Sequence, residues 1–396
     1  EVYAATNLGR DKTVLVRMNP ANCQELELLY ENDQYDISSI SYSRKRKKLL
    51  SVYCTGHKEP IRHYFDADEE ALRARIKAHF PNQRYGIADT DKAEEHYLIY
   101  VGGDRTRGAY WFYDAQTDEA TPMAELAPWI KAEDMNEMHA VKYASRDGLT
   151  IEAYLTLPNG LSINEAHQLP VVINPHGGPW ARDCWGYSSE VQFLANRGYA
   201  VFQMNFRGST GYGRSFLEAS YKQWGLKMQD DITDGVNWLI EQGIADKDRI
   251  AIYGGSYGGY AVLAGLTLTP DVYACGIDYV GVSNLFTFMK TIPPYWRPML
   301  EMMYEQVGDP EKDAEQLAAT SPALHADKIR VPLFIAQGAN DPRVNKAESD
   351  QMVAALKERG IEVEYMVKDN EGHGFHNQEN RFDFYRAMEA FLKKYL

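Results

Sequence analysis

The pattern of apolar and polar positions divides the chain into two regions of different kind. From residue 1 to about residue 135, short strand-like runs are separated by turn signals rich in Gly, Asn and Asp, which predicts an all-β region. From residue 139 to residue 396, short apolar runs alternate with stretches of helical periodicity. This alternation predicts a mostly parallel, doubly wound sheet with helices on both faces.

Strands in the first region are predicted at Thr13–Met18, Ile37–Tyr42, Leu49–Cys54, His63–Phe65, Tyr97–Val101 and Tyr110–Tyr113. One helical insert, Asp68–Phe80, interrupts them. Groups of strands recur about every 40–50 residues, a period typical of propeller blades with four strands each. The repeat is too weak to establish a propeller by itself.

Strands in the second region are continuous apolar runs, as buried parallel strands are. They are predicted at Val171–Asn174, Tyr199–Met204, Arg249–Tyr253, Cys275–Val280, Val331–Ala336 and Val363–Val367. Helices are predicted at Ser189–Asn196, Asp231–Gln242, Tyr257–Leu268, Lys346–Arg359 and Arg381–Tyr395. A region of this length can bury a large core.

Composition and charge narrow the classes of partner. Apolar residues make up 44% of the chain and charged residues 25%, which excludes a collagen-like or wholly disordered protein. The net charge of −14 disfavours a nucleic-acid partner, because an acidic chain repels phosphates. The basic run Arg44–Lys48 fits a localisation signal or a solvated hairpin turn, and the apolar residues that follow it favour the turn.

The chain carries no sign of a membrane span, a disulfide framework or a signal peptide. Ile250–Thr269 holds no charged residue, but its glycines indicate a strand, a tight turn and a buried helix. The spacing of the four cysteines fits no metal or redox motif, so free thiols are expected. The absence of a disulfide framework favours the cytoplasm. The missing initial Met leaves export open, because an upstream segment could carry a signal.

One glycine-rich string carries the strongest chemical signal. Gly254–Gly259 reads G-G-S-Y-G-G, follows a predicted strand and begins a predicted helix. This is the G-x-S-x-G pattern, which places Ser256 on a sharp strand-to-helix turn. Both flanks need glycine, since side chains would clash across the turn. The turn also places the next backbone N–H at a helix N-terminus, where it stabilises an oxyanion. A glycine-rich turn with a structural serine is the alternative.

A serine hydroxyl needs a base to become a nucleophile. Asp341 and His373 each follow a predicted strand, at the sheet edge where open α/β folds hold their sites. His373 would act as general base and then general acid, and Asp341 would fix its tautomer.

Other residues compete for these two roles. Asp350 and Asp369 are alternative acids, but the first lies within a predicted helix and the second is only four residues from His373. His376 is an alternative base, but it lacks the flanking glycines that would let it reach over the sheet edge.

A second oxyanion donor is expected from His176–Pro179, which reads H-G-G-P and follows a predicted strand. The string is similar to the H-G-G-G signal of lipases, in which glycine lets a backbone N–H approach the oxyanion. A simple tight turn is the alternative. The chain has neither an H-E-x-x-H motif nor a P-loop, and Gly208–Gly213 has the wrong order for a dinucleotide fingerprint. The sequence therefore implies no metal and no organic cofactor.

Five motifs in order make the chain resemble the prolyl oligopeptidase family of serine peptidases, in the branch of acylaminoacyl and dipeptidyl peptidases. They are H-G-G-P at His176, N-F-R-G-S-T-G-Y-G at Asn205–Gly213, G-G-S-Y-G-G at Gly254, D-P-R-V at Asp341 and E-G-H-G-F at Glu371. The resemblance covers residues 139–396 well. Residues 1–135 resemble the family only in their degenerate strand repeats.

The resemblance implies an α/β-hydrolase domain at residues 139–396, capped by a propeller of seven or eight blades, and cleavage of short peptides. Such a propeller needs roughly 300 residues at about 40 per blade. Residues 1–135 have room for the last two or three blades, so we expect a piece of a longer protein. If the chain were complete, a size-filtering cap would be in doubt.

The resemblance also implies roles for single residues. It assigns Ser256, Asp341 and His373 to a catalytic triad, and the backbone N–H groups of Tyr257 and Gly178 to the oxyanion hole. Residues expected to bind substrate are Arg343, on a substrate carbonyl, and Val344, Phe286, Tyr295 and Trp296, around the residue before the scissile bond. A surface salt bridge is the alternative for Arg343, and plain core packing for the aromatic residues.

The sequence thus favours a serine peptidase acting on oligopeptides, with acylaminoacyl and dipeptidyl specificity not separated. A carboxylesterase with the same triad is one alternative, although a dedicated esterase usually lacks the strand repeats found before residue 135. A non-catalytic binding module with a relic hydrolase fold is another, and the intact set of catalytic residues disfavours it. Whether the protein forms a homo-oligomer stays open.

Overall fold

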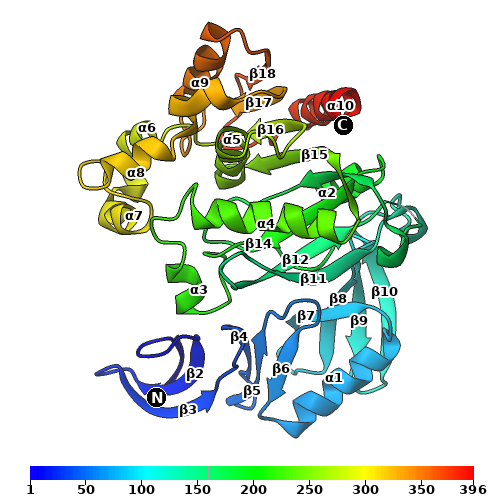
Figure 1. Ribbon diagram of the computed structural model, residues 1–396. Helices are drawn as coiled ribbons and strands as arrows, with labels where there is room; N and C mark the ends of the chain where they lie inside the picture. The colour runs from blue at the N-terminus through cyan, green and yellow to red at the C-terminus, as the bar shows by residue number, and fades with distance from the viewer. Residues whose placement is uncertain (159) are drawn as a thin grey trace.

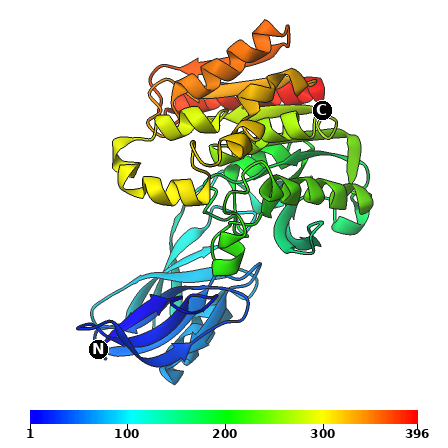
Figure 2. The same ribbon diagram turned by 60° about the vertical axis from the view of Figure 1, so that its left-hand side comes forward.

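Two regions of different architecture follow one another in the computed structural model, which describes residues 1–158 and 160–396 (Figure 1). We name residues 1–135 the β-region and residues 139–396 the α/β region. The β-region contains three antiparallel sheets, and the α/β region contains one eight-stranded sheet with its helices. In Figures 1 and 2 the N-terminus lies in the lower body and the C-terminus in the upper one.

The sheets of the β-region are small. The first has the order β1 (Val2–Thr6), β2 (Val14–Asn19), β3 (Gln24–Tyr30), and the second β4 (Ile37–Ser43), β5 (Lys48–Cys54), β6 (Ile61–Tyr64). The third has the order β10 (Glu119–Glu125), β9 (Ala109–Asp114), β8 (His96–Gly102), β7 (Arg84–Thr90). Only the third sheet has the four strands expected of a blade.

All six strands predicted in this region are present, and four more are found: β1, β3, β7 and β10. Each of these four is the edge strand of its sheet. Most residues of β3 and β10 are exposed, so neither strand needs an apolar face. The pattern of hydrophobic residues therefore could not reveal them.

Helix α1 (Ala67–His79) lies where the helical insert was predicted. Its N-cap, Asp66, accepts a hydrogen bond from the Glu69 backbone N–H at 2.9 Å. The same carboxylate pairs with Arg46 at 2.9 Å and Lys48 at 2.7 Å. The basic run thus forms the β4–β5 hairpin turn and the start of β5, as the apolar residues after it indicated, and two of its cations anchor α1.

The sheet of the α/β region is mixed, with β11 (Met138–Ala144) and β12 (Thr150–Thr156) antiparallel at one end. The remaining strands are parallel: β13 (Leu169–Ile173), β14 (Ala200–Asn205), β15 (Ala245–Gly255), β16 (Cys275–Tyr279), β17 (Leu333–Gly338) and β18 (Val363–Lys368). The spatial order is β11-β12-β14-β13-β15-β16-β17-β18. The sequence pattern gave the six parallel strands and not the antiparallel pair.

The helices of this region are α2 (Ser189–Ala195), α3 (Arg214–Glu218), α4 (Lys227–Glu241), α5 (Tyr257–Leu268), α6 (Leu285–Lys290), α7 (Leu300–Gln306), α8 (Ala314–Ala319), α9 (Lys346–Glu358) and α10 (Gln378–Tyr395). The five predicted helices correspond to α2, α4, α5, α9 and α10. Among the described residues, no helix combines the length and apolar character that a membrane crossing needs.

Both faces of the sheet are buried, which explains the continuous apolar strands. Ile250 and Ile252 of β15 belong to the core that includes α4, α5 and α9. Ala251 and Tyr253 of the same strand belong to the core that includes α2 and α10. This period of two places one row of side chains on each face, so the predicted doubly wound arrangement is confirmed.

Asp278 of β16 is a carboxyl group sealed inside this fold. A Cβ atom placed on Gly259 or Gly281 would lie 2.3 or 2.1 Å from Asp278 Oδ1. Neither carboxyl oxygen has a well-formed hydrogen bond to the described residues. Burial raises the pKa of Asp278 to about 7, and the buried carboxyl of Glu348 nearby acts in the same direction. The negative charge is therefore unfavourable here.

We predict that Asp278→Asn reduces the dependence of stability on pH. Because the folded protein holds this proton more tightly than the unfolded chain, the free energy of unfolding falls as pH rises from about 4 towards 7. The asparagine variant should be the more stable form at pH 8, by about 1–4 kcal/mol. Urea unfolding at pH 5 and pH 8 measures this. Asp271→Asn, at an exposed carboxylate, is the control, and equal pH dependence in both variants would exclude Asp278 as the cause.

Candidate active site

Ser256 lies between the end of β15 and the start of α5, at a sharp turn of the backbone. Its φ is 58° and its ψ −117°, a conformation that is strained for a residue with a side chain and costs about 1–3 kcal/mol. Its backbone N–H donates to the Tyr279 carbonyl at 2.9 Å. Such strain persists only where the surrounding structure fixes the backbone.

Gly254 and Gly258, which flank the serine, let backbone segments approach each other closely around the turn. A Cβ on Gly254 would lie 2.7 Å from the backbone of Gly258, and a Cβ on Gly258 would lie 2.3 Å from the Pro175 carbonyl oxygen. Backbone atoms cannot move away as a flexible side chain can. The predicted need for glycine on both sides of the serine is confirmed.

Asp341 and His373 meet at the edge of the sheet, after the ends of β17 and β18. His373 Nδ1 donates to Asp341 Oδ2 at 2.7 Å, and the Asp341 side chain is fully buried. The other carboxylate oxygen accepts the backbone N–H groups of Arg343 and Val344 at 2.8 and 2.9 Å. Because Nδ1 carries the hydrogen in this bond, Nε2 is left free to accept a proton.

The competing acids do not contact His373. The Asp350 carboxylate binds Lys346 and the Tyr365 hydroxyl, and Asp369 contributes only its backbone carbonyl, which accepts from Asn340 at 2.6 Å. His376 is exposed.

The loop that carries His373 is held by Glu371, which is 3% exposed. Its carboxylate accepts four hydrogen bonds of 2.7–2.9 Å, from the backbone N–H groups of His376 and Asn377 and the side-chain amides of Asn377 and Asn380. These donors lower the pKa of Glu371 to about 2, although burial opposes the shift. Glu371 therefore stays charged and fixes the loop near neutral pH.

Tyr279 links the two halves of the site. Its carbonyl accepts from Ser256 N, and its hydroxyl accepts from the backbone N–H of Phe375, two residues after His373. Among the described residues, Ser256 Oγ has no hydrogen bond to His373. In catalytic sites of this kind that bond commonly tightens only when substrate binds.

The two expected oxyanion donors lie beside Ser256. The Tyr257 N–H begins α5. Gly178 is exposed and has a φ of 128°, which glycine adopts most readily. Both residues line the same pocket as Ser256.

This pocket has a volume of about 250 Å³ and a mostly apolar lining. It is lined by Gly178, Trp180, Trp224, Ser256, Tyr257, Val282, Phe288, Trp296, Met299, Met302, Met303, Arg343 and Val344. Three of the residues expected to bind substrate, Arg343, Val344 and Trp296, are therefore at the pocket. Phe286 packs against the core instead, and Tyr295 is 57% exposed, so neither lines it.

Sequence reasoning missed most of the apolar lining. On α6, Phe288 lines the pocket and Phe286 does not, because residues two apart point to different sides of a helix. Met299, Met302 and Met303 follow the i, i+3, i+4 spacing of one helical face. Helical periodicity over residues 299–303 could have identified these methionines from the sequence.

Arg343 has a free guanidinium at the pocket. Within residues 1–158 and 160–396 no carboxylate pairs with it, so the salt-bridge alternative is not realised. A planar fork of unpaired donors next to Ser256 is suited to bind a peptide carbonyl.

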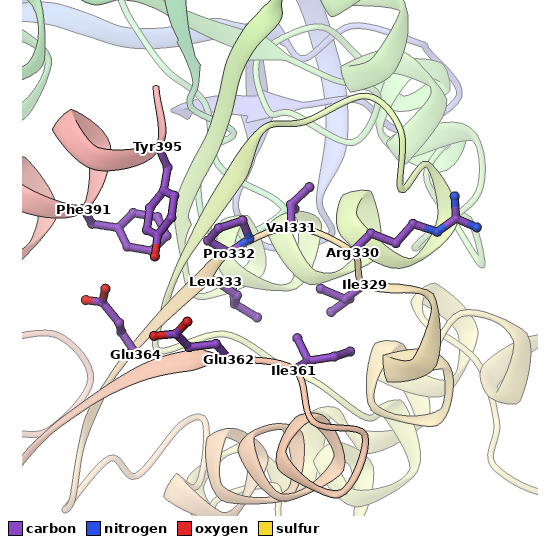
Figure 3. Close-up of a pocket in the computed structure, with 10 residues that line it drawn as sticks. All are labelled: Ile329, Arg330, Val331, Pro332, Leu333, Ile361, Glu362, Glu364, Phe391 and Tyr395. Carbon is purple, nitrogen blue, oxygen red and sulfur yellow. The ribbon is translucent and has the colours of Figure 1, made fainter.

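A second pocket of about 270 Å³ lies at the opposite end of the sheet (Figure 3). Pro332, Leu333, Glu362, Glu364 and Tyr395 are among its lining residues. It is formed where β17 and β18 begin, whereas Asp341 and His373 follow the ends of these strands. It is lined by no serine, cysteine or histidine and is separate from Ser256, Asp341 and His373.

Comparison with known proteins places this geometry in a family. The model of the prolyl oligopeptidase family matches residues 185–396. The whole chain is 46% identical to dipeptidyl aminopeptidase BIII of Pseudoxanthomonas mexicana, of which it covers 58%. The chain belongs to the prolyl oligopeptidase family. It is also 35% identical to dipeptidyl peptidase family member 6 of Caenorhabditis elegans, over 98% of this chain and 55% of that protein.

Solved structures of two peptidases share the fold. A puromycin-hydrolysing peptidase of Mycobacterium tuberculosis matches 100% of this chain with a TM-score of 0.84 at 22% identity, over 60% of its own length. An acylaminoacyl peptidase of Pyrococcus horikoshii matches 98% of this chain with a TM-score of 0.74 at 21% identity, over 59% of its length. The chain thus spans little more than half the length of these proteins, and the expected fold, β-sheets followed by an α/β hydrolase, is confirmed.

We predict that Glu371→Gln weakens both stability and catalysis. The amide cannot accept all four hydrogen bonds, so the free energy of unfolding at pH 7 should fall by about 1–3 kcal/mol, and kcat should fall because the His373 loop loosens. A lowered pKa also means that this carboxylate stabilises the fold above about 4.5 and ceases to do so as pH falls towards about 2.

Acid titration of unfolding measures the effect, since the glutamine variant should lose less stability between these pH values than the unmodified protein. Glu379→Gln, at an exposed position of the same segment, is the matched control. Equal acid sensitivity in all three proteins would contradict the prediction.

Proposed function

We propose that the protein is a serine peptidase that hydrolyses short peptides through an acyl-enzyme on Ser256. The observation that carries the proposal is the 2.7 Å bond between His373 and Asp341 at the edge of the sheet that also holds the strained Ser256 turn. Family membership supports it. We further propose that residues 1–135 and 139–396 act as two domains, the first being part of a propeller.

In the proposed mechanism, Ser256 Oγ attacks the scissile carbonyl carbon while His373 Nε2 takes the hydroxyl proton. The carbonyl oxygen becomes an oxyanion and accepts hydrogen bonds from the N–H groups of Tyr257 and Gly178. The C–N bond then breaks, and His373 returns the proton to the departing amine. Water attacks the acyl-enzyme by the same route and releases the acid. Asp341 stabilises the imidazolium in both halves.

We propose dipeptidyl aminopeptidase specificity over acylaminoacyl specificity. The two relatives with dipeptidyl names align with 100% and 98% of this chain, β-region included. The acylamino-acid-releasing enzyme of Arabidopsis thaliana aligns with only 57% of it at 28% identity. Selection for a free amino terminus must come from residues outside the triad, so similarity in the β-region favours the dipeptidyl assignment.

The pocket beside Ser256 supports a preference for an apolar residue before the scissile bond. Met299, Met302 and Met303 give it an adaptable wall, because methionine side chains are flexible and polarizable. Trp224 and Phe288 form rigid aromatic surfaces on it. No carboxylate is among its lining residues, so a basic side chain would lack a partner there.

We predict that matched dipeptide anilides with a free amine are cleaved faster than their acetylated forms. Ser256→Ala should lower the rate on both by about 10⁴-fold or more with an unchanged circular dichroism spectrum. The measurement is release of the aniline by both proteins.

Faster cleavage of the acetylated set would instead indicate an acylaminoacyl peptidase. Cleavage of simple esters alone would favour the carboxylesterase alternative. Equal rates for Ser256→Ala and the unmodified chain would rule out Ser256 as the nucleophile.

A further inference from the structure

The motif Asn205–Gly213 has no place in the mechanism above, and no residue of it lines the pocket at Ser256. We name residues 205–215 the bridge segment and residues 176–181, which include Gly178, the oxyanion loop. The bridge segment lies between the oxyanion loop and the β-region, and its hydrogen bonds go to both. In Figures 1 and 2 its last part enters α3, which points from the upper body towards the strands of the β-region.

Towards the β-region, consecutive backbone groups of the bridge segment form hydrogen bonds with two aspartates, Asp36 and Asp11. The Gly211 carbonyl accepts from Asp36 N at 3.0 Å, and Gly213 N donates to Asp36 Oδ2 at 3.1 Å. Arg214 N donates to the carbonyl of Asp11 at 2.8 Å, and Ser215 N donates to its carboxylate at 2.7 Å. This end of the segment therefore follows the position of the β-region.

The Tyr212 hydroxyl is the centre of a buried polar network. It accepts from Asn205 Nδ2 and from Arg182 Nη2, each at 2.9 Å, and donates to Glu152 Oε2 at 3.1 Å. The other Glu152 oxygen accepts from the hydroxyl of Tyr35, in the β-region, at 2.7 Å. One chain of hydrogen bonds thus runs from the β-region through Glu152 to Tyr212 and Arg182.

Towards the active site, the bridge segment holds both ends of the oxyanion loop. Ser209 Oγ is hydrogen-bonded to His176 Nε2 at 2.8 Å, and Thr210 N donates to the Ala181 carbonyl at 2.9 Å. His176 also stacks on Phe206 with ring centroids 4.3 Å apart. Arg182, directly after the loop, reaches the β-region itself through the Thr55 carbonyl at 3.3 Å.

The middle of the bridge segment is fixed to the α/β region by a buried ion pair. Arg207 bonds Asp231 at 2.7 Å and Asp147 at 2.9 Å, and the Arg207 and Asp231 side chains are 4% and 0% exposed. Arg207 therefore fixes the start of the segment to the α/β region, while the backbone from Gly211 to Ser215 takes its position from Asp36 and Asp11 of the β-region.

We propose that the bridge segment is a brace through which the docked β-region holds the oxyanion loop in its catalytic position. Tyr212 and Arg182 are then positioning residues, which act on the reaction through the Gly178 N–H. The proposal rests on the proposed function, since it assigns a role to that N–H.

The physical reason is that an oxyanion donor works only at the right place. A loop alone holds a backbone N–H loosely, and a misplacement of about 1 Å can lower a rate by 10²-fold. The donor acts on the transition state, so a displaced loop lowers kcat and leaves KM largely unchanged.

Tyr35→Phe and Tyr212→Phe test the brace, because each removes one hydroxyl at opposite ends of the network and keeps the ring. Amide hydrogen exchange, followed on a peptide that covers residues 174–184, reports the loop directly. We expect about tenfold faster exchange there in both variants. We also expect kcat to fall about tenfold with KM within twofold.

The control is Asp104→Ala, which removes the 2.8 Å hydrogen bond that the Asp104 carboxylate accepts from the Met138 backbone N–H. This contact joins the β-region to the start of β11 and involves neither the bridge segment nor the oxyanion loop. Exchange in residues 174–184 should stay unchanged in this variant. Melting temperatures confirm that all three variants are folded.

Unchanged exchange in Tyr35→Phe would overturn the proposal, since the β-region would then not act on the loop. Equal acceleration in Asp104→Ala would also overturn it, because the interface would only have loosened as a whole. If the unmodified chain cleaves no peptide, the exchange result still decides on the brace, and only the proposed function fails.

Discussion

The position of α5 between the ends of three strands is the constraint on which the site depends. Gly254 and Gly258 touch each other, Gly258 lies against the Pro175 carbonyl, and Gly259 lies against Asp278. No side chain fits on these glycines, so their contacts fix both the residue at which α5 begins and its position against the strands. The Tyr257 N–H at its start, the serine before it and the pocket beside it all take their places from this packing.

Much of the fold and the positions of Ser256, Asp341 and His373 at one sheet edge could be predicted, because each element and each motif is short and local in the sequence. The turn at Ser256 is encoded by the six consecutive residues Gly254–Gly259, and Asp341 and His373 each follow a predicted buried strand. The residues that line the pocket were harder to predict, because they come from segments far apart in the chain. The family resemblance implied Phe286 and Tyr295 as pocket residues, but the backbone places Phe288 and the methionines at the cavity instead.

The missed strands have a different cause. β1, β3, β7 and β10 are sheet edges, whose backbone bonds need no apolar side chains. The antiparallel pair β11 and β12 was missed because the expected βα units do not include it. Likewise, the motif at Asn205–Gly213 could be noticed in the sequence, but its contacts to Asp36 and Glu152 join residues more than 50 positions apart.

Stability and the proposed chemistry are opposed at Ser256. A φ of 58° is unfavourable for serine and ordinary for glycine. Replacing Ser256 by glycine would remove the hydroxyl and relieve the backbone at the same time, so the variant that lacks the proposed nucleophile would fold better than the protein that has it. Under the proposed mechanism, folding stability favours loss of this serine, and only selection for the reaction itself keeps it there.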